Sequence, residues 1–362
     1  MKPFFRNYSL ILIFAIQLIV YRVLGSQEYF VTEIYLPFYI KFQSFYILVF
    51  NHFPFSVGDI FYIISIGFLL FSIVKIGISL YRKKFTDAKL YFTKILRFFS
   101  ILIFLFYWFF GFLYADNQLK KQLEANDISV DELKVLAQYY LIKTKQLSQE
   151  NQNELIEENV QQSLNNSVLT FNDSIIRLKT HPEVMVKKSM FSNAISYLGI
   201  AGYYNPFTYE AHYNCNIPTH NLPFTLAHEK AHQLGYASES EANFIGFMLC
   251  KKSNSISTQY SANFMALKYL LSEIYSYDSI YVKKVINNYS TEMQKNRWEE
   301  KLYFNRYQGR ISSAFSSMND LYLKLNHQEG IKSYNNFVKL LVAYHRKRVL
   351  PYGKTPKNEN SS

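Results

Sequence analysis

Long apolar stretches are the feature that most limits how this chain can fold, and all of them lie in its first third. Three have the length needed to cross a bilayer, at about 8–24, 60–80 and 98–114. The last reads FFSILIFLFYWFFGFLY and carries no charge. We therefore expect three transmembrane helices within residues 1–115. The first is expected to be an uncleaved signal-anchor, because no small-residue cleavage site follows it.

Basic residues around these stretches indicate how the chain is oriented. The segment 81–97 holds six Lys/Arg, whereas 25–59 holds one Lys and three acids. Lys and Arg concentrate in cytoplasmic loops of membrane proteins. We therefore expect a multi-pass protein with a cytoplasmic N-terminus, a cytoplasmic 81–97 loop, and all residues after about 115 outside the cytoplasm.

The stretch 35–55 is apolar and aromatic but is interrupted by Pro37, Lys41 and His52. We interpret it as a segment that lies at the outer membrane surface. A fourth span is the alternative, and it would place the rest of the chain in the cytoplasm together with an outward-facing basic loop.

Charge is distributed unevenly along the chain. Residues 1–115 hold 11 Lys/Arg against 4 Asp/Glu, and 116–362 hold 28 against 23. The excess positive charge of the first part lies near membrane boundaries, and the second part has no clustered basic face with aromatic platforms. Nucleic acid is therefore not an expected partner. The two cysteines, Cys215 and Cys250, are expected to be two small buried thiols.

The polar remainder predicts a helical domain with a small β element. Residues 116–180 are expected to form a helical stalk or first layer, because VDELKVLAQYYLIKTKQL is amphipathic and follows the capping residue Ser129. The run TYEAHYNCNI alternates as a short strand does. Further helices are expected at about 223–234, 238–252, 258–276, 280–295, 311–326 and 333–347. The main domain is expected to span 181–350, before a disordered tail at 351–362.

The motif that carries chemistry is His228-Glu229-Lys230-Ala231-His232. On a helix, the two histidines lie four residues apart on one face, so both imidazoles can reach one metal ion. Glu229 lies beside the first ligand, where its carboxylate can take a proton from water without binding the metal. This pattern predicts a Zn²⁺ site. Two surface histidines among solvated acids are the plain alternative.

A catalytic zinc usually has a third protein ligand. Gly235 can end the motif helix and Ser238 can cap a second helix, which places Glu239 in the first turn of that helix. Glu241 lies about 200° away from it around the helix. We therefore expect Glu239 to be the third ligand, with Glu241 as the alternative.

These residues carry a resemblance. The run LPFTLAHEKAHQLGYASESEANFIGFML resembles the core of an uncharacterised bacterial membrane-protein family, domain of unknown function 3810. FPFSVGDIFY, YNPFTYEAH and RYQGRISSAFSSMNDLYLKLN are similar to the same family, in which an uncharged residue is usual where Lys230 stands. ESEAN resembles the element of gluzincin metallopeptidases whose first Glu, here Glu239, binds zinc. The resemblance implies a zincin-like domain in a bacterial inner membrane protein.

The sequence as a whole predicts a membrane-anchored zinc metallopeptidase that acts outside the cytoplasm. A peptide substrate is expected to pair with the strand around 209–213, which contains Tyr209, Glu210, Ala211, His212 and Tyr213. An inactive or structural-zinc envelope protein that serves as a binding or sensing module is the alternative. A transport function is disfavoured, because the spans lack paired intramembrane acids.

Overall fold

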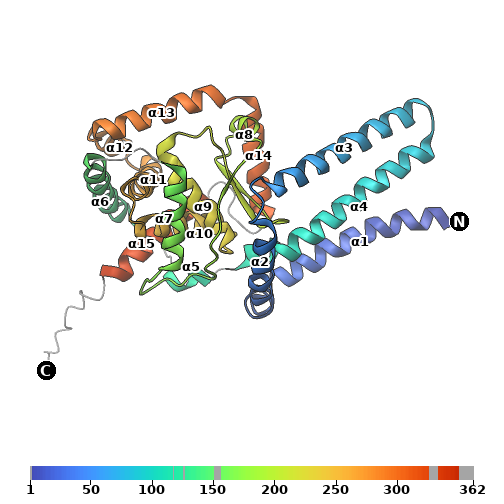
Figure 1. The fold of residues 1–362 in the computed structure, drawn as a ribbon, viewed down its shortest axis with the longest axis horizontal. Coiled ribbons are helices and arrows are strands. Elements are labelled where there is room, and N and C mark those ends of the chain that lie inside the picture. The colour runs from blue at the N-terminus through green and yellow to red at the C-terminus, as the bar shows by residue number, and fades with distance from the viewer. Residues whose placement is uncertain (1, 117, 125–126, 151–155, 326–332, 350–362) are drawn as a thin grey trace. The chain divides into compact units, whose positions relative to one another are not determined.

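The computed structural model is mainly helical, with one three-stranded sheet (Figure 1). It describes residues 2–116, 118–124, 127–150, 156–325 and 333–349. The chain divides into two compact units. The N-terminal unit comprises Met1–Asp116, Val184–Ser196 and Ile200–Asn216. The C-terminal unit comprises Asn117–Glu183, Tyr197–Gly199 and Ile217–Ser362.

The N-terminal unit contains the apolar helices and the sheet. Its first part holds α1 (Lys2–Gly25), the π-helix η1 (Phe30–Tyr35), α2 (Leu36–Phe50), α3 (Val57–Tyr81), α4 (Phe85–Phe109) and the 3-10 helix η2 (Gly111–Ala115). Its second part holds β1 (Lys187–Lys188), α8 (Ser192–Tyr197), β2 (Gly202–Asn205) and β3 (Glu210–Tyr213).

Helices α3 and α4 form a hairpin and are long and apolar enough to cross a membrane (Figure 1). The Ser56 hydroxyl begins α3 by accepting a hydrogen bond from the Asp59 backbone N–H at 2.8 Å. Many large apolar side chains of the hairpin, including Ile64 and Leu70, point outward. Exposing such surface to water costs about 25 cal/mol per Å², so a lipid environment favours this arrangement.

The expected number of spans was wrong. Among the described residues, two helices are long and apolar enough to be spans, whereas three were expected; in α1, whose side chains are described from Leu12 onward, Leu12–Gly25 is a shorter apolar segment. The expected 81–97 loop is also mostly helical. Only a short turn follows Tyr81, and α4 begins at Phe85, because apolar residues such as Leu90 continue the helical pattern between the charges.

Helix α2 occupies most of the aromatic stretch 35–55 and follows η1 without a break. Its Tyr39 is buried, with ring centroids 5.5 Å from Tyr209 and 6.4 Å from Phe110. This face of α2 therefore packs on protein. The interfacial position of the stretch stays a prediction.

The sheet has the strand order β1-β3-β2. Strand β1 runs parallel to β3, with Lys188 opposite Tyr213, and β2 runs antiparallel to it, with Tyr203 opposite His212. The expected role of β3 in pairing with a substrate backbone is not supported by this topology. β3 is the central strand and is paired on both sides at His212 and Tyr213, so it has no free edge there.

Strand β3 also holds the start of α3. The Glu210 carboxylate accepts hydrogen bonds from the backbone N–H groups of Val57 at 3.2 Å and Gly58 at 2.5 Å, and its charge is balanced by Lys187 at 2.6 Å. A Cβ on Gly58 would lie 2.5 Å from Asn205 Nδ2, so only glycine allows this approach. A carboxylate at a helix N-terminus is stabilised by the helix dipole.

In the described residues of the C-terminal unit, every regular element is a helix. These are α5 (Gln118–Leu123), α6 (Val130–Gln149), α7 (Glu157–Leu169), η3 (Thr219–Asn221), α9 (Leu222–Gln233), α10 (Glu239–Lys252), α11 (Ile256–Tyr275), α12 (Ser279–Asn287), α13 (Thr291–Tyr307), α14 (Arg310–Leu325) and α15 (Ser333–Val349).

The core of this unit lies where α10 packs against α9, α11 and α15. Phe244, Phe247, Phe264 and Phe337 are fully buried there, each contributing roughly 1.5–3 kcal/mol of burial free energy. Helix α6 packs on α11 and begins with the expected cap at Ser129, which forms a reciprocal capping box with Glu132. Helices α6 and α7 therefore pack on the other helices of this unit.

Three further expectations differ from the structure. The single helix expected at 280–295 is divided into α12 and α13, because Ser290 caps a new helix start. The sheet, expected in the 181–350 domain, groups with the N-terminal residues. Cys250 is buried as expected, but Cys215 is exposed, and both thiols are free. The expected disordered tail at 351–362 lies outside the described residues.

Candidate metal centre

Two helices and a glycine turn build the centre. Pro223 occupies the first turn of α9, where its missing N–H costs nothing. Gly235 ends the motif helix with a φ of 88°, a left-handed conformation that favours glycine. Ser238 then stands at the N-cap position of α10, as expected, but its hydroxyl makes no capping hydrogen bond and lies 2.9 Å from the Ser240 hydroxyl. This reversal brings the first turn of α10 back to the histidines of α9.

Three predicted ligands converge. The Nε2 atoms of His228 and His232 are 3.2 Å apart. The Glu239 carboxylate lies 3.4 Å from His228 Nε2 through one oxygen and 3.8 Å from His232 Nε2 through the other. His228, Glu229 and His232 also form a group whose possible ligand atoms all lie within 4.8 Å of one another. These contacts favour Glu239 as the third ligand, while Glu241 is a buried residue of the same turn.

Both imidazoles are oriented through their other nitrogen. His232 Nδ1 lies 2.7 Å from the Tyr236 carbonyl oxygen, which can only accept, so this nitrogen donates. His228 Nδ1 lies 2.9 Å from the Asn243 side-chain oxygen. When both rings are neutral, each Nε2 therefore presents a lone pair toward the other and toward a carboxylate. A shared cation fits this set of acceptors, and such outer hydrogen bonds are usual around zinc-bound histidines.

The ionisation of these groups reflects burial and their mutual charges. Burial opposes the charged form of His228, but the Glu239 hydrogen bond and the charges of Glu229 and Glu239 outweigh it and raise its pKa to about 9. Burial and the neighbouring His228 lower the pKa of His232 to about 4. A proton on His228 thus supplies positive charge at this site in the absence of a metal ion. Binding of a metal ion would release this proton.

Glu229 lies beside both histidines, with a carboxylate oxygen within 4.8 Å of their possible ligand atoms. Its side chain is 3% exposed, and burial raises the pKa of its carboxyl to about 8. Its Oε2 atom is buried and accepts no hydrogen bond from protein. An unsatisfied carboxylate oxygen beside two imidazoles can accept a proton from a water molecule or donate one to a substrate.

Two residues that sequence reasoning did not select complete the centre. Asn243, four residues after Glu239 on α10, accepts the hydrogen bond of His228 Nδ1. Gly246 allows α10 to approach the motif, since a Cβ there would lie 2.9 Å from the His228 backbone nitrogen. A glycine inside a helix seven residues after a ligand was the only signal for this contact, because glycine disfavours helix interiors.

Lys230 lies on the far side of α9 and is fully buried. Its Nζ donates a 2.6 Å hydrogen bond to the Asn165 side-chain oxygen of α7. Burial lowers the pKa of this amine to about 7, partly offset by the charge of Glu183. The departure from the family pattern is therefore a packing feature between α7 and α9.

The predicted substrate residues, Tyr209 to Tyr213, form and precede β3 in the N-terminal unit. All five are buried, and His212 Nε2 lies 2.6 Å from the Ser56 hydroxyl. His220, in the C-terminal unit, pairs with Glu300 at 3.2 Å. Both histidines therefore have structural partners, as expected of ordinary histidines.

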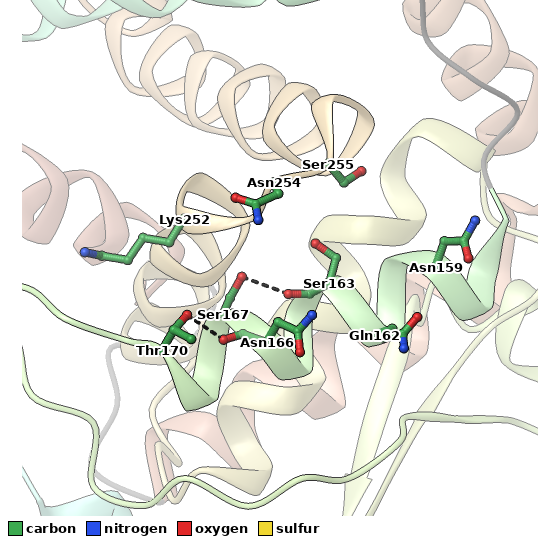
Figure 2. A pocket seen from close by; sticks show the side chains of 9 residues that line it. All are labelled: Asn159, Gln162, Ser163, Asn166, Ser167, Thr170, Lys252, Asn254 and Ser255. Carbon is green, nitrogen blue, oxygen red and sulfur yellow. Dashed lines mark hydrogen bonds between the residues drawn. The ribbon is translucent and has the colours of Figure 1, made fainter.

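A pocket of about 370 Å³ lies between α7 and the start of α11 (Figure 2). Its lining consists of Asn159, Gln162, Ser163, Asn166, Ser167, Thr170, Lys252, Asn254 and Ser255. The Ser167 and Thr170 hydroxyls bond to carbonyls of their own helix, and the Lys252 amine is bonded to the Asn172 carbonyl. None of the lining residues is an acid or a histidine, so the pocket lacks the side chains that commonly bind zinc.

Comparison with known proteins gives one match. A family model described as a protein of unknown function (DUF3810) matches residues 35–342. This range includes the α3 start, the sheet and the metal centre. No curated protein and no solved structure matches the chain. The resemblance to family 3810 is therefore confirmed, whereas the resemblance to gluzincins stays a hypothesis.

Proposed function

Because the chain belongs to the DUF3810 family, whose description assigns no reaction, we propose its function from the metal centre: a membrane-anchored, zinc-dependent metallopeptidase. The observation that carries this proposal is the convergence of His228 Nε2, His232 Nε2 and the Glu239 carboxylate within 3.8 Å of one another. Two imidazoles and one carboxylate are the protein ligand set of many catalytic zinc sites.

The proposed mechanism assigns each residue a separate task. Zinc, when bound, supplies a Lewis acid that polarises the scissile carbonyl and lowers the pKa of water. His228, His232 and Glu239 would hold the metal, and Asn243 and the Tyr236 carbonyl keep the imidazoles in the required tautomer. Glu229 accepts a proton from the attacking water and then donates it to the leaving amine.

Peptide hydrolysis is favoured by the spacing of these groups along the chain. The HExxH segment followed by a glycine turn and an acidic second helix is similar to the gluzincin arrangement, in which Glu239 and Asn243 take the positions of the third ligand and its neighbour. We therefore propose a zincin-like arrangement of α9 and α10.

The side on which the peptidase acts follows from the basic residues. The six Lys/Arg of 81–97 lie in the turn between α3 and α4 and in the first half of α4. Such residues stay cytoplasmic. We therefore propose that the start of α3 and the end of α4 lie outside the cytoplasm. The substrates are therefore proposed to be extracytoplasmic peptides or proteins.

A structural zinc site in a binding or sensing module is the second candidate. The burial of His232 and Glu229 favours it, because a structural site is closed to substrate. The two candidates differ in one respect: only the peptidase needs Glu229 to exchange a proton.

The test compares the full chain with Glu229→Gln, which keeps the size of the side chain but removes its basicity. We expect both proteins to bind one zinc ion and the variant to lose about 10²–10⁴-fold in hydrolysis of an unstructured protein such as casein. Equal turnover of parent and variant would exclude the mechanism. Zinc binding without turnover by the parent, over a panel of peptides, would support the structural site.

A further inference from the structure

Helix α13 presents a row of large apolar side chains on its outer face, and it lies along one edge of the C-terminal unit (Figure 1). Trp298, which is 60% exposed, and Leu302, one turn later, form this row, whereas Phe304, 59% exposed, lies about 120° around the helix from Trp298. Met293 and Asn296, on the opposite face, are buried in the unit. The row therefore lies on the face of α13 that does not pack against the rest of this unit.

Cations border this row. Residues 295–310 contain two acids and five basic residues: Lys295, Arg297, Lys301, Arg306 and Arg310. Glu300, one of the acids, is turned inward to Lys268 at 2.5 Å and to His220 at 3.2 Å. The exposed face of α13 thus combines aromatic and aliphatic side chains with a net positive charge.

Helix α14 also exposes large apolar side chains. It begins directly after Gly309, and Ile311, Met318 and Leu321 along it are all exposed, Met318 by 62%. The spacing 311, 318, 321 is that of an apolar stripe on an amphipathic helix.

We propose that the outer face of α13 and α14 docks on an anionic phospholipid surface. Tryptophan is enriched at the membrane–water interface, and helices that lie in this interface combine such apolar residues with flanking Lys and Arg. The positive border complements anionic headgroups. The same chain carries two helices of spanning length. These helices would keep a bilayer surface close to α13 and α14, at a high effective concentration.

Docking would hold the C-terminal unit against the membrane surface. This restricts the partners of the metal centre to molecules near the bilayer, whatever reaction the centre performs. The inference therefore stands or fails independently of the proposed peptidase activity.

The test uses the two tryptophans of the chain, Trp108 and Trp298. The full-length Trp108→Phe protein, in which only Trp298 remains, is reconstituted in phosphatidylcholine/phosphatidylglycerol vesicles that contain lipids brominated near the headgroup end of the acyl chain. We expect Trp298 fluorescence to be blue-shifted and quenched by these lipids.

Two comparisons make the test specific. The control is a chain in which Trp108 and Trp298 are replaced and Tyr277→Trp supplies the single tryptophan. Position 277 is about as exposed as Trp298 but lies between the acids Glu273 and Asp278, so its fluorescence should stay unquenched. Lys301→Gln with Arg306→Gln, or vesicles of phosphatidylcholine alone, should reduce quenching at Trp298. At about 1 kcal/mol per cation, the double variant lowers the ratio of docked to undocked chains roughly thirtyfold.

Three outcomes would overturn the proposal. Unquenched Trp298 with the emission of water-exposed indole in anionic vesicles shows that the face is not docked. Equal quenching of the reporters at positions 277 and 298 shows that the contact is not specific to this face. A blue shift without quenching that grows with protein density shows contact between chains rather than with lipid.

Discussion

At the residue scale, the tautomers of His228 and His232 explain why their Nε2 atoms face one another. Neither Asn243 nor the Tyr236 carbonyl contributes a ligand, yet their hydrogen bonds at 2.9 and 2.7 Å turn both rings inward. The site is therefore arranged before any ion arrives, which reduces the cost of ordering the ligands on binding.

Asn243→Ala should lower zinc affinity about 10–100-fold, because His228 loses the acceptor that orients it. Asn243→Asp, which keeps an acceptor oxygen at the same place, should retain most of the affinity. Competition with a zinc chelator measures both variants. Equal affinity of Asn243→Ala and the parent would show that this hydrogen bond does not support the site.

Lys230 makes stability depend on pH. Its pKa of about 7 in the folded state lies below the about 10.4 of an unfolded lysine, so between these values the unfolded chain binds the proton and stability rises with pH. The full effect is on the order of 4 kcal/mol. In Lys230→Met the rise between pH 7 and 10 should disappear from urea-unfolding midpoints in detergent. An unchanged slope would show that the amine is charged in the fold.

The residues adjacent in the motif could be predicted from spacing, because four residues make one helical turn in any context. The position of Glu239 could be predicted as well, since Gly235 ends α9 and Ser238 stands directly before α10. The burial of Lys230 could not, because it depends on Asn165, 65 residues away. Composition alone places a lysine in solvent.

At the element scale, the metal centre depends on how closely α10 packs on α9. Gly246 provides this closeness: its absent side chain makes room for the backbone at Ala227 and His228. Gly246→Ala should therefore push the helices apart, cost about 1–3 kcal/mol of stability and weaken zinc binding. Gly77→Ala is a matched control, because a Cβ at Gly77 meets nothing within 4 Å. Unfolding midpoints and zinc titration distinguish the two, and identical behaviour would contradict the packing argument.

Element boundaries were predictable where a capping residue marks them, as at Ser129, whose side chain caps α6. They were not where charge and helix overlap. The segment 81–97 carries six cations and was expected to be a loop, but its apolar residues keep the helical period, and a helix at a membrane boundary can direct its cations to the headgroups. Ser290 was missed as a cap because the residues on both sides of it are equally polar.

At the scale of the whole molecule, the N-terminal unit is assembled from distant parts of the chain. The sheet residues near 187–213 join the start of α3 through Glu210, Lys187 and Gly58. No local pattern predicts this, because strands of two to four residues take their partners from the fold. The sequence-based boundary near 181 therefore assigned the sheet to the other unit.

The orientation of the chain can be tested with its own cysteines. Cys215 is exposed and Cys250 is buried, so a membrane-impermeant maleimide added to right-side-out vesicles should label Cys215 alone. In a Cys215→Ser chain, Lys83→Cys, in the turn between α3 and α4, should be labelled only after the membrane is permeabilised. The reverse pattern would place the metal centre in the cytoplasm.

The most direct measurement is the zinc content of the full-length protein, by elemental mass spectrometry after dialysis. The account predicts one zinc per chain in the parent and in Glu241→Ala, and none in His228→Ala, His232→Ala or Glu239→Ala. Retained zinc in the histidine variants, or a parent that binds no zinc from a zinc-supplemented buffer, would contradict it.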